Sequence, residues 1–407
     1  MLAGATDGIK TWIVDTGLDG APLSELMAGF CGRLVEAGVP LWRASIGAES
    51  LHPLNDAQGY VWHDGEGAQE SFFPRKTTSE QEQDWLASPF YQLIEGGEQT
   101  MRRRLAVGEG ANEFPMLGRL AAEGGTDYFA RLVDFGEQGR LGELRGLATS
   151  WTTRDSAGFA EDDVGLIEAT LPTLGLAFKA RLAADTARTV ATTYLGSSVA
   201  GHVLKGEIER GKVRAKRMVL WFSDLTGFTR LADTLPQDQL IELLNAYADC
   251  LVEVVHAYRG QVVKFLGDGI LGGFYGERGE ACGRALDAAL AACAAIEALN
   301  EVRAAAGLPV TGFTLALHEG DVLYGNIGSR DRLDYTVVGP AVNEIARIQS
   351  MSRPLDEPVL VSASFVEACS AERARLVSLG RYALKGVNRP QELFTLDREE
   401  VAVPALG

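Results

Sequence analysis

Basic residues are scarce in this sequence. Lys and Arg number 38 against 55 Asp and Glu, so the 407 residues carry a formal net charge of −17. This balance excludes nucleic acid as the main partner, because a phosphate backbone binds to a basic face. An acidic protein can still bind a polyphosphate when metal ions lie between the two.

Cysteine, histidine and long apolar runs are also limited. The five cysteines form no CxxC pair and the five histidines show no HxxxH spacing, which argues against a structural zinc site. No N-terminal segment resembles a signal peptide, and no run approaches the ~18 apolar residues of a membrane span. We therefore expect a reduced, cytoplasmic protein that contacts no membrane.

The length allows two or three domains, and the first half is typical of one mixed α/β domain. The segment SELMAGFCGRLVEAG has helical spacing and should end at Gly38. Strand-like segments such as GYVWHD and GELRGLATSWTT follow. A long amphipathic helix with an acidic first turn comes next, and Pro172 should kink it. Its apolar residues, three or four apart, are Val164, Ile167, Leu171, Leu174, Phe178 and Leu182.

The end of this half, GELRGLATSWTTRDSAGFAEDDVGLIEATLPTLGLAF, resembles the closing strand, loop and final helix of a GAF sensory domain. The resemblance implies a GAF-like sensory domain at 1–160 with an unknown small-molecule ligand; a purely structural dimerisation domain is the alternative. The helix at 161–195 either faces the core or forms a helical linker and dimer seam. Residues 196–217 are polar and Gly-punctuated, and we interpret them as a solvated connector rather than a nucleic-acid patch.

The second half has the pattern of a ferredoxin-like α/β (α+β) domain. The apolar run MVLWFS (218–223) predicts a central strand, and a helix with Pro236 in its first turn follows. Two strands joined at GDG, a helix at about 280–306 and a strand around TGFTLALHEG complete the order β-α-β-β-α-β.

Two carboxylates should converge in this fold. Asp224 closes the first strand, and Asp268 lies in the hairpin turn beside it. Such a pair can hold two hard divalent cations with the help of phosphate oxygens, and paired cations suit phosphoryl transfer. Each Asp alone would more often be a turn residue or a helix cap.

Three further residues suit an anionic phosphate. Asn343 and Arg347 are four residues apart in GPAVNEIARIQSM, hence on one helix face, and Lys385 precedes a glycine in YALKGVNRP. From spacing alone, an ordinary exposed helix face is the better explanation of Asn343 and Arg347, and Lys385 either holds a phosphate or is a solvated lysine.

Four segments together match a family. LWFSDLTGFTRLAD, VVKFLGDGIL, HEGDVLYGNIGSRDRLDYTVVGPAVNEIAR and LKGVNRPQELF resemble, in order, the catalytic domain of class III adenylate cyclases, which sets this domain at 218–398. Two positions depart from the usual pattern. Gly269 stands where alanine is frequent, and Pro340 stands at the second position of a segment that often reads GDAVN in the family.

The resemblance implies a role for each matching residue. Asp224 and Asp268, with the backbone at Leu225, would hold two Mg²⁺ or Mn²⁺ ions. Lys264 and Thr336 would read the purine. Guanylate cyclases usually carry Glu and Cys there, so this pair implies ATP, and the threonine resembles the bacterial IIIb subclass.

The remaining matches complete the implied reaction. Asn343 would orient the ribose, Arg347 would stabilise charge on the α-phosphate, and Lys385 would bind the triphosphate. The resemblance implies conversion of ATP to 3′,5′-cyclic AMP and pyrophosphate at the interface of a homodimer, with the N-terminal domain setting activity. The alternatives are a guanylate cyclase and a non-catalytic, ligand-binding signalling module.

Overall fold

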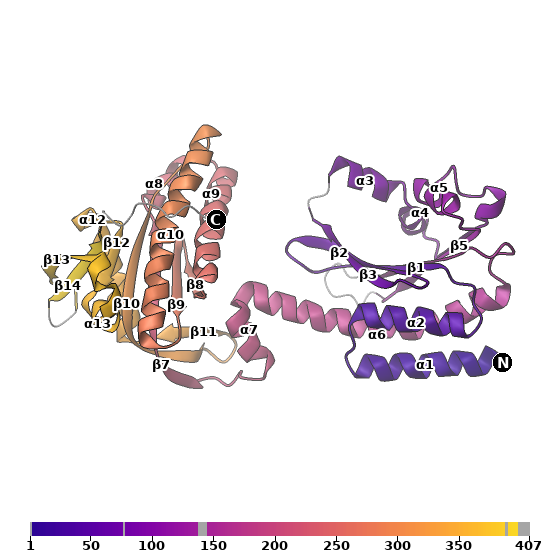
Figure 1. Cartoon of the computed structure of the whole chain (residues 1–407), viewed down its shortest axis with the longest axis horizontal. Coiled ribbons are helices and arrows are strands. Elements are labelled where there is room, and N and C mark those ends of the chain that lie inside the picture. Colours follow the sequence, from indigo (N-terminus) through magenta and orange to yellow (C-terminus); the bar gives the residue numbers. More distant parts are fainter. Residues whose placement is uncertain (1, 76–77, 137–144, 387–389, 398–407) are drawn as a thin grey trace. The chain divides into compact units, whose positions relative to one another are not determined.

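The computed structural model describes residues 2–75, 78–136, 145–386 and 390–397 (Figure 1). The chain divides into two compact units, Met1–Thr193 and Tyr194–Gly407. Within the described residues, no helix combines the length and the apolarity that a membrane crossing needs. Residues 142–144 and 387–389, which belong to two of the motifs above, lie outside the described part.

The N-terminal unit is built on a six-stranded antiparallel sheet in the order β3-β2-β1-β6-β5-β4. Its strands are β1 (Arg43–Glu49), β2 (Asn55–His63), β3 (Gly67–Pro74), β4 (Thr100–Arg103), β5 (Asp127–Asp134) and β6 (Gly146–Thr153). Along β1, the buried residues Ala44, Ile46 and Ala48 alternate with less buried ones, so the two faces of this strand differ in character.

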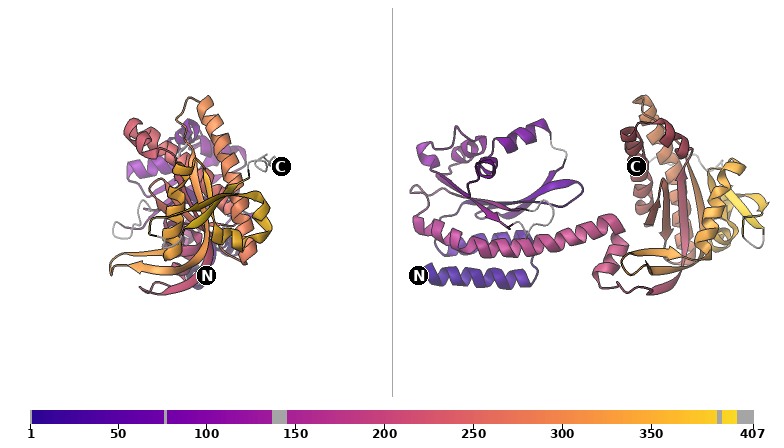
Figure 2. Two further views of the ribbon diagram at one scale, coloured as in Figure 1. Left: turned by 90° about the vertical axis from the view of Figure 1, so that its left-hand side faces the viewer. Right: turned by 180° about the vertical axis from the view of Figure 1, so that it is seen from behind.

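Helices cover both faces of this sheet. Figure 2 shows α1 (Leu2–Leu18), α2 (Leu23–Glu36) and α6 (Glu161–Leu195) on one side. Together they bury the larger core of the unit around Phe30, Trp151 and Phe178. On the other side are α3 (Ser79–Leu86), α4 (Pro89–Gly96), the short η1 (Leu105–Val107) and α5 (Pro115–Ala122). A smaller cluster that includes Tyr128 lies under this second group.

Helix α6 confirms the predicted long helix. Its packing also shows which of the two interpretations of its apolar residues is right. All six apolar residues that suggested a dimer seam are buried, and they pack in the core of their own unit: Val164, Ile167, Leu171, Leu174, Phe178 and Leu182. The core-facing interpretation is therefore right for this stripe, and a seam formed by it is wrong. Periodicity reveals a buried face, but it does not identify what covers that face.

The C-terminal unit is built on an eight-stranded sheet. The order is β13-β14-β12-β10-β7-β9-β8, and β11 pairs with β10. Its strands are β7 (Val213–Leu225), β8 (Gln261–Leu266), β9 (Gly269–Phe274), β10 (Phe313–Gly328), β11 (Leu333–Val338), β12 (Val359–Ser362), β13 (Leu376–Tyr382) and β14 (Gln391–Leu396). The inner order β10-β7-β9-β8 contains the predicted β-α-β-β-α-β arrangement, which places β7 beside the β8–β9 hairpin.

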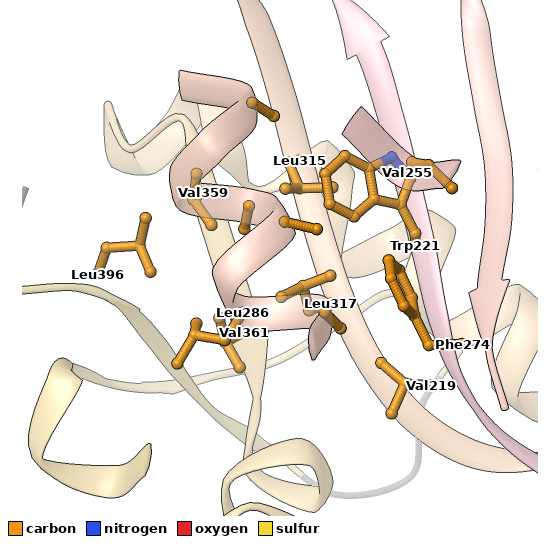
Figure 3. Packing of buried hydrophobic residues seen from close by; sticks show 14 of the residues in the cluster. Val219, Trp221, Val255, Phe274, Leu286, Leu315, Leu317, Val359, Val361 and Leu396 are labelled. Carbon is orange, nitrogen blue, oxygen red and sulfur yellow. The ribbon is translucent and has the colours of Figure 1, made fainter. Parts of the chain in front are cut away.

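Two long helices cover one face of this second sheet. They are α9 (Gln237–Ala257) and α10 (Arg278–Ala305). The shorter α8 (Phe228–Thr234), α13 (Ala363–Ala368) and η3 (Ser370–Arg375) lie on the same face. Figure 3 shows Trp221 and Phe274 facing each other in this core, with ring centroids 6.2 Å apart. The opposite face carries α7 (Ser197–Leu204), α11 (Pro340–Ser350) and α12 (Ser352–Leu355).

The segment predicted to be a solvated connector is structured. Val199 and Ala200 of α7 are buried, and Val199 packs in a core cluster of the C-terminal unit. The first residues of β7, from Val213 to Arg217, pair along β10. The linker interpretation is wrong there. The five residues are all exposed and three of them are basic, so no buried face marks the segment as a strand.

Candidate active site

Two carboxylates meet where β7 ends and the β8–β9 hairpin turns. Asp268 lies between Leu266 and Gly269, and its Oδ2 accepts a hydrogen bond of 3.3 Å from the Leu225 amide. Burial of Asp224, followed by the charge and the hydrogen bond of Asp268, raises the pKa of Asp224 to about 6. The predicted convergence is present, and it concentrates negative charge at this strand end.

This pair has the donor chemistry of a divalent cation site. Among the described residues, no group of three or more His, Cys, Asp or Glu side chains gathers around one point, so two carboxylates would form only part of a coordination shell. Hard cations such as Mg²⁺ commonly complete such a shell with water and phosphate oxygens. The raised pKa of Asp224 fits this use, because a bound cation would relieve the repulsion between the carboxylates.

The backbone around the pair is tightly placed. A Cβ added to Gly269 would lie 3.2 Å from Asp224 Oδ1 and 3.1 Å from the Ser223 carbonyl oxygen. Thr314 Oγ1 donates a hydrogen bond of 3.3 Å to the Asp224 carbonyl. The glycine that departs from the family pattern therefore leaves room beside a candidate metal ligand.

Lys264 pairs with a residue that the sequence analysis missed. Its Nζ donates to Asp334 Oδ2 at 2.6 Å, and this hydrogen bond is the main cause that lowers the pKa of Asp334. Thr336 is two residues further along β11, so it shares a face with Asp334. Lys264, Asp334 and Thr336 thus form one polar group on β8 and β11.

Asn343 and Arg347 lie one helical turn apart on α11, as the spacing predicts. Asn343 is exposed and Arg347 is half-buried. The Arg347 guanidinium approaches the turn that holds Lys385: a Cβ on Gly386 would lie 3.3 Å from both Nη atoms. The fold therefore brings Arg347 next to the Lys385–Gly386 segment, although the two are far apart in sequence.

A second missed residue is Arg353, which lies in α12. Its charge lowers the pKa of Asp224, against the larger effects of burial and Asp268. Arg353 belongs to no motif that the sequence analysis recognised. The pairing of Lys264 with Asp334 had a weak signal, because alternation along LDYTVV places Asp334 and Thr336 on one face.

Family comparison identifies the domain that carries these residues. The family described as Adenylate and Guanylate cyclase catalytic domain matches residues 212–398. This segment is a nucleotide cyclase catalytic domain. The match begins after the N-terminal unit, so it gives no support for a GAF identity of that unit.

Curated relatives resemble the same cyclase domain. An uncharacterised protein of Mycobacterium tuberculosis is 34% identical over 46% of this chain and 34% of its own length. Adenylate cyclase 1 of Rhizobium meliloti is 27% identical over 42% of this chain and 26% of its own length. The adenylate cyclase of Anabaena cylindrica is 29% identical over 40% and 33%. The chain thus spans about a third or less of the length of these relatives.

Solved structures of both substrate types match this part of the chain. The guanylyl cyclase Cya2 is 26% identical, with a TM-score of 0.41, over 46% of this chain and 95% of its own. The adenylyl cyclase CyaB from P. aeruginosa is 25% identical, with a TM-score of 0.43, over 48% of this chain and all of its own.

Proposed function

We propose that this protein is an adenylate cyclase that converts ATP to 3′,5′-cyclic AMP and pyrophosphate. The observation that carries the proposal is the convergence of Asp224 and Asp268 inside a nucleotide cyclase domain. In the reaction, the ribose 3′-oxygen forms a bond to the α-phosphorus, and the bond from that phosphorus to the bridging β-phosphate oxygen breaks. Pyrophosphate leaves with that oxygen, and the proton of the 3′-hydroxyl passes to Asp224 or to solvent.

Each site residue has a separate task in this proposal. Asp224, Asp268 and the backbone at Leu225 would hold Mg²⁺ or Mn²⁺, which supplies charge neutralisation on the triphosphate and lowers the pKa of the 3′-hydroxyl. Asn343 would hold the ribose so that its 3′-oxygen faces the α-phosphorus. On the same helix face, Arg347 would donate hydrogen bonds to the α-phosphate as its charge rises.

Lys385 would bind the outer phosphates. It is exposed, and it precedes the glycine that the Arg347 guanidinium approaches. Two cations placed together suit a triphosphate better than either one alone, since each can contact different phosphoryl oxygens. Arg353 acts on Asp224 instead, so within one chain its positive charge lies with the metal carboxylates.

The polar group on β8 and β11 supports ATP as the substrate. Lys264 can donate to an adenine ring nitrogen, and Thr336 can accept from the exocyclic amine. In this proposal Asp334 is a positioning residue, because its carboxylate holds the Lys264 ammonium at 2.6 Å on the face that Thr336 shares. A lysine held in this way loses less rotamer freedom when the purine binds.

We further propose that two chains form the active sites head to tail. Lys264 pairs with Asp334, whereas Asp268 contacts the end of β7, so the two charges of one hairpin have different partners. In the homodimer, one chain would supply the metal carboxylates of a site, and the other would supply Lys264, Thr336 and the α11 residues. The N-terminal unit would then act as a GAF-like sensory domain that sets the orientation of the two cyclase domains. The closing strand β6 and helix α6, both present as predicted, support this part.

Product analysis of the purified full chain tests the proposal. With Mg²⁺ or Mn²⁺, ATP should yield cyclic AMP, and GTP should compete weakly. Production of cyclic GMP alone would favour the guanylate cyclase, and no product from either nucleotide would favour a non-catalytic signalling module.

Mixing variants tests the shared sites. Asp224→Ala and Arg347→Ala chains should each be inactive alone and regain activity together, because a mixed dimer contains one intact site. A mixture of Asp224→Ala and Asp268→Ala chains is the matched control, since both changes fall in the same half-site. Recovery in the control, or none in the first mixture, would contradict the head-to-tail arrangement.

A further inference from the structure

A chain of hydrogen bonds leads from helix α11 to the two carboxylates of the candidate metal site. Gln349 Nε2 donates to Thr314 Oγ1 at 2.7 Å, and Thr314 Oγ1 donates to the Asp224 carbonyl at 3.3 Å. The next link is the Leu225 amide, which donates to Asp268 Oδ2 at 3.3 Å. The chain of bonds therefore begins on α11 and ends on the second carboxylate of the site.

One peptide group stands at the centre of these hydrogen bonds. The Asp224 carbonyl and the Leu225 N–H belong to the same planar unit, and they point in opposite directions because the peptide is trans. Thr314 therefore holds this peptide at its oxygen, while Asp268 holds it at its nitrogen. Fixing both ends restricts rotation of the plane, which is attached directly to the Cα atom of Asp224. The direction of the Asp224 side chain thus depends on Thr314 as well as on Asp268.

The Asp224 carbonyl fixes the direction of the two bonds that lead to it. A carbonyl oxygen only accepts, so the single proton of the Thr314 hydroxyl goes to Asp224. The hydroxyl oxygen then accepts, and the Gln349 amide supplies the proton. Thr314 is buried, and hydrogen bonds linked in series away from water strengthen one another. Removal of either side chain should therefore loosen the peptide group that the two hold together.

Helix α11 is a fixed support for these bonds. Its residues Ile345 and Ile348 are buried in a core cluster that joins the helix to the sheet. Gln349 directly follows Ile348 and is half-buried. Thr314 and Asp224 are in register on β10 and β7, so their side chains point to one face of the sheet, the face that α11 covers. The packing of the helix thus sets the position of Gln349 against the metal carboxylates of its own chain.

The same helix presents Arg347 in another direction. An α-helix turns by about 100° per residue, so Gln349 projects about 200° away from Arg347 around the helix axis. Arg347 approaches the turn at Gly386, whereas Gln349 contacts Thr314 beside the metal carboxylates. In the proposed homodimer, Arg347 completes a site whose carboxylates come from the second chain. The two sides of α11 therefore face two different active sites.

We propose that Gln349 is a positioning residue of the metal site, acting through Thr314 on the peptide group of Asp224. The proposal rests on the adenylate cyclase function proposed above and extends it, because it gives α11 a task in both active sites of the dimer. The ribose and phosphate residues of the helix serve one site, and Gln349 serves the other. Gln349 touches neither substrate nor metal, so its loss should weaken cation binding rather than abolish the reaction.

Binding of Mn²⁺, followed by electron paramagnetic resonance, tests the positioning role without turnover. The full chain is titrated with Mn²⁺ in the presence of 3′-deoxy-ATP, which lacks the attacking hydroxyl. Gln349→Leu and the isosteric Thr314→Val should each weaken Mn²⁺ binding about three- to tenfold. Thr314→Ser keeps the hydroxyl and should recover most of that loss, and Gln239→Leu, at an exposed position on α9, is the matched control. Unchanged Mn²⁺ affinity in both Gln349→Leu and Thr314→Val would overturn the proposal.

Mixed dimers show which active site Gln349 serves. In a mixture of Asp224→Ala and Arg347→Ala chains, the one intact site takes its carboxylates from the Arg347→Ala chain. Gln349→Leu placed in that chain should raise the Mg²⁺ concentration needed for half-maximal cyclic AMP production about three- to tenfold. Placed in the Asp224→Ala chain, it should leave this Mg²⁺ requirement as it was. An equal rise in both mixtures, or a rise only in the second, would contradict the proposal.

Failure of this proposal is distinguishable from failure of the proposed function. If the mixture is inactive before Gln349 is changed, the head-to-tail site is wrong, and the Mn²⁺ titration still decides the positioning role. If the mixture is active but its Mg²⁺ requirement does not respond to Gln349→Leu in either chain, only the positioning role is wrong.

Discussion

The Lys264 ammonium lies 2.6 Å from the Asp334 carboxylate, across two strands and 70 positions of sequence. The pair is about half exposed, so its contribution to stability is small. Its position matters more, since Asp334 holds the lysine on the face of β11 that carries Thr336. In the proposed adenylate cyclase, Asp334 would therefore influence the choice of substrate although it does not itself contact the purine.

Asp334→Asn should weaken discrimination for ATP without abolishing the reaction. The lysine would lose its charged anchor, and we expect the ratio of kcat/KM for ATP over GTP to fall about tenfold, which corresponds to about 1.4 kcal/mol. The change should appear mainly in KM. Asp331→Asn, an exposed acidic residue just ahead of β11, is the control and should leave the ratio unchanged.

Asp224→Asn should stabilise the metal-free protein at neutral pH. Because the folded protein raises the pKa of this group from 3.8 to about 6, its protonated form is favoured, and the resulting stability is lost as the pH rises through 6. After discounting for solvent screening, we expect a gain of about 1 kcal/mol at pH 7.5 and none at pH 4.

Added Mg²⁺ distinguishes the relief of repulsion between Asp224 and Asp268 from a general stabilisation of the protein. It should raise the Tm of the unaltered chain and have little effect on Asp224→Asn, while cyclase activity is lost in the variant. Asp233→Asn, an exposed neighbour in α8, should behave like the unaltered chain in both respects. Destabilisation by Asp224→Asn at pH 7.5 would mean that the two carboxylates do not repel each other.

His318 should make the cyclase domain sensitive to acid. Its ring is 4% exposed, lies 3.0 Å from the Ser362 hydroxyl, and has a pKa lowered to about 4 by burial. The folded protein thus favours the neutral ring, and stability falls as the pH drops from 6.5 towards 4, by about 3 kcal/mol in total. Urea unfolding across this range should lose that slope in His318→Gln but keep it in the exposed control His256→Gln.

In the proposed homodimer, the second half of α6 offers the second chain a face that differs from the predicted stripe. Leu176, Val190 and Tyr194 are 67%, 37% and 82% exposed. With Ala180, Ala183 and Ala187 between them, they recur every three or four residues on the side opposite the core stripe. We expect Ala187→Cys chains to cross-link rapidly under mild oxidation and Thr192→Cys chains, on the opposite side, to cross-link slowly. Equal rates would exclude this seam.

Local sequence patterns predicted individual helices, strands and turns better than they predicted how distant segments pair with one another. The helical spacing of α6, the apolar run of β7 and the turn at Asp268 are set by neighbouring residues, and each was predicted. The five exposed residues at the start of β7, three of them basic, became a strand only through pairing with β10, about 100 positions away. A strand segment without a buried face is hard to distinguish from a solvated linker in the sequence.

The candidate site shows the same difference between local features, which were predicted, and long-range contacts, which were missed. Motif positions were enough to bring Asp224 near Asp268 and to place Asn343 with Arg347 on one helix face. Asp334 and Arg353 were missed because their partners, Lys264 and Asp224, come from distant segments. A pair of charges that lie far apart in the sequence can be recognised only from the folded structure, because residue spacing within one segment carries no information on it.

The β8–β9 hairpin, which carries both Lys264 and Asp268, has a genetic consequence in the proposed dimer. A chain altered at both positions would damage both sites of any dimer it enters, one through the purine pocket and the other through the metal carboxylates. Such a chain would therefore be dominant over the unaltered one. Random pairing of equal amounts would leave about a quarter of the dimers with full activity. Chains altered at only one of the two positions would instead complement each other.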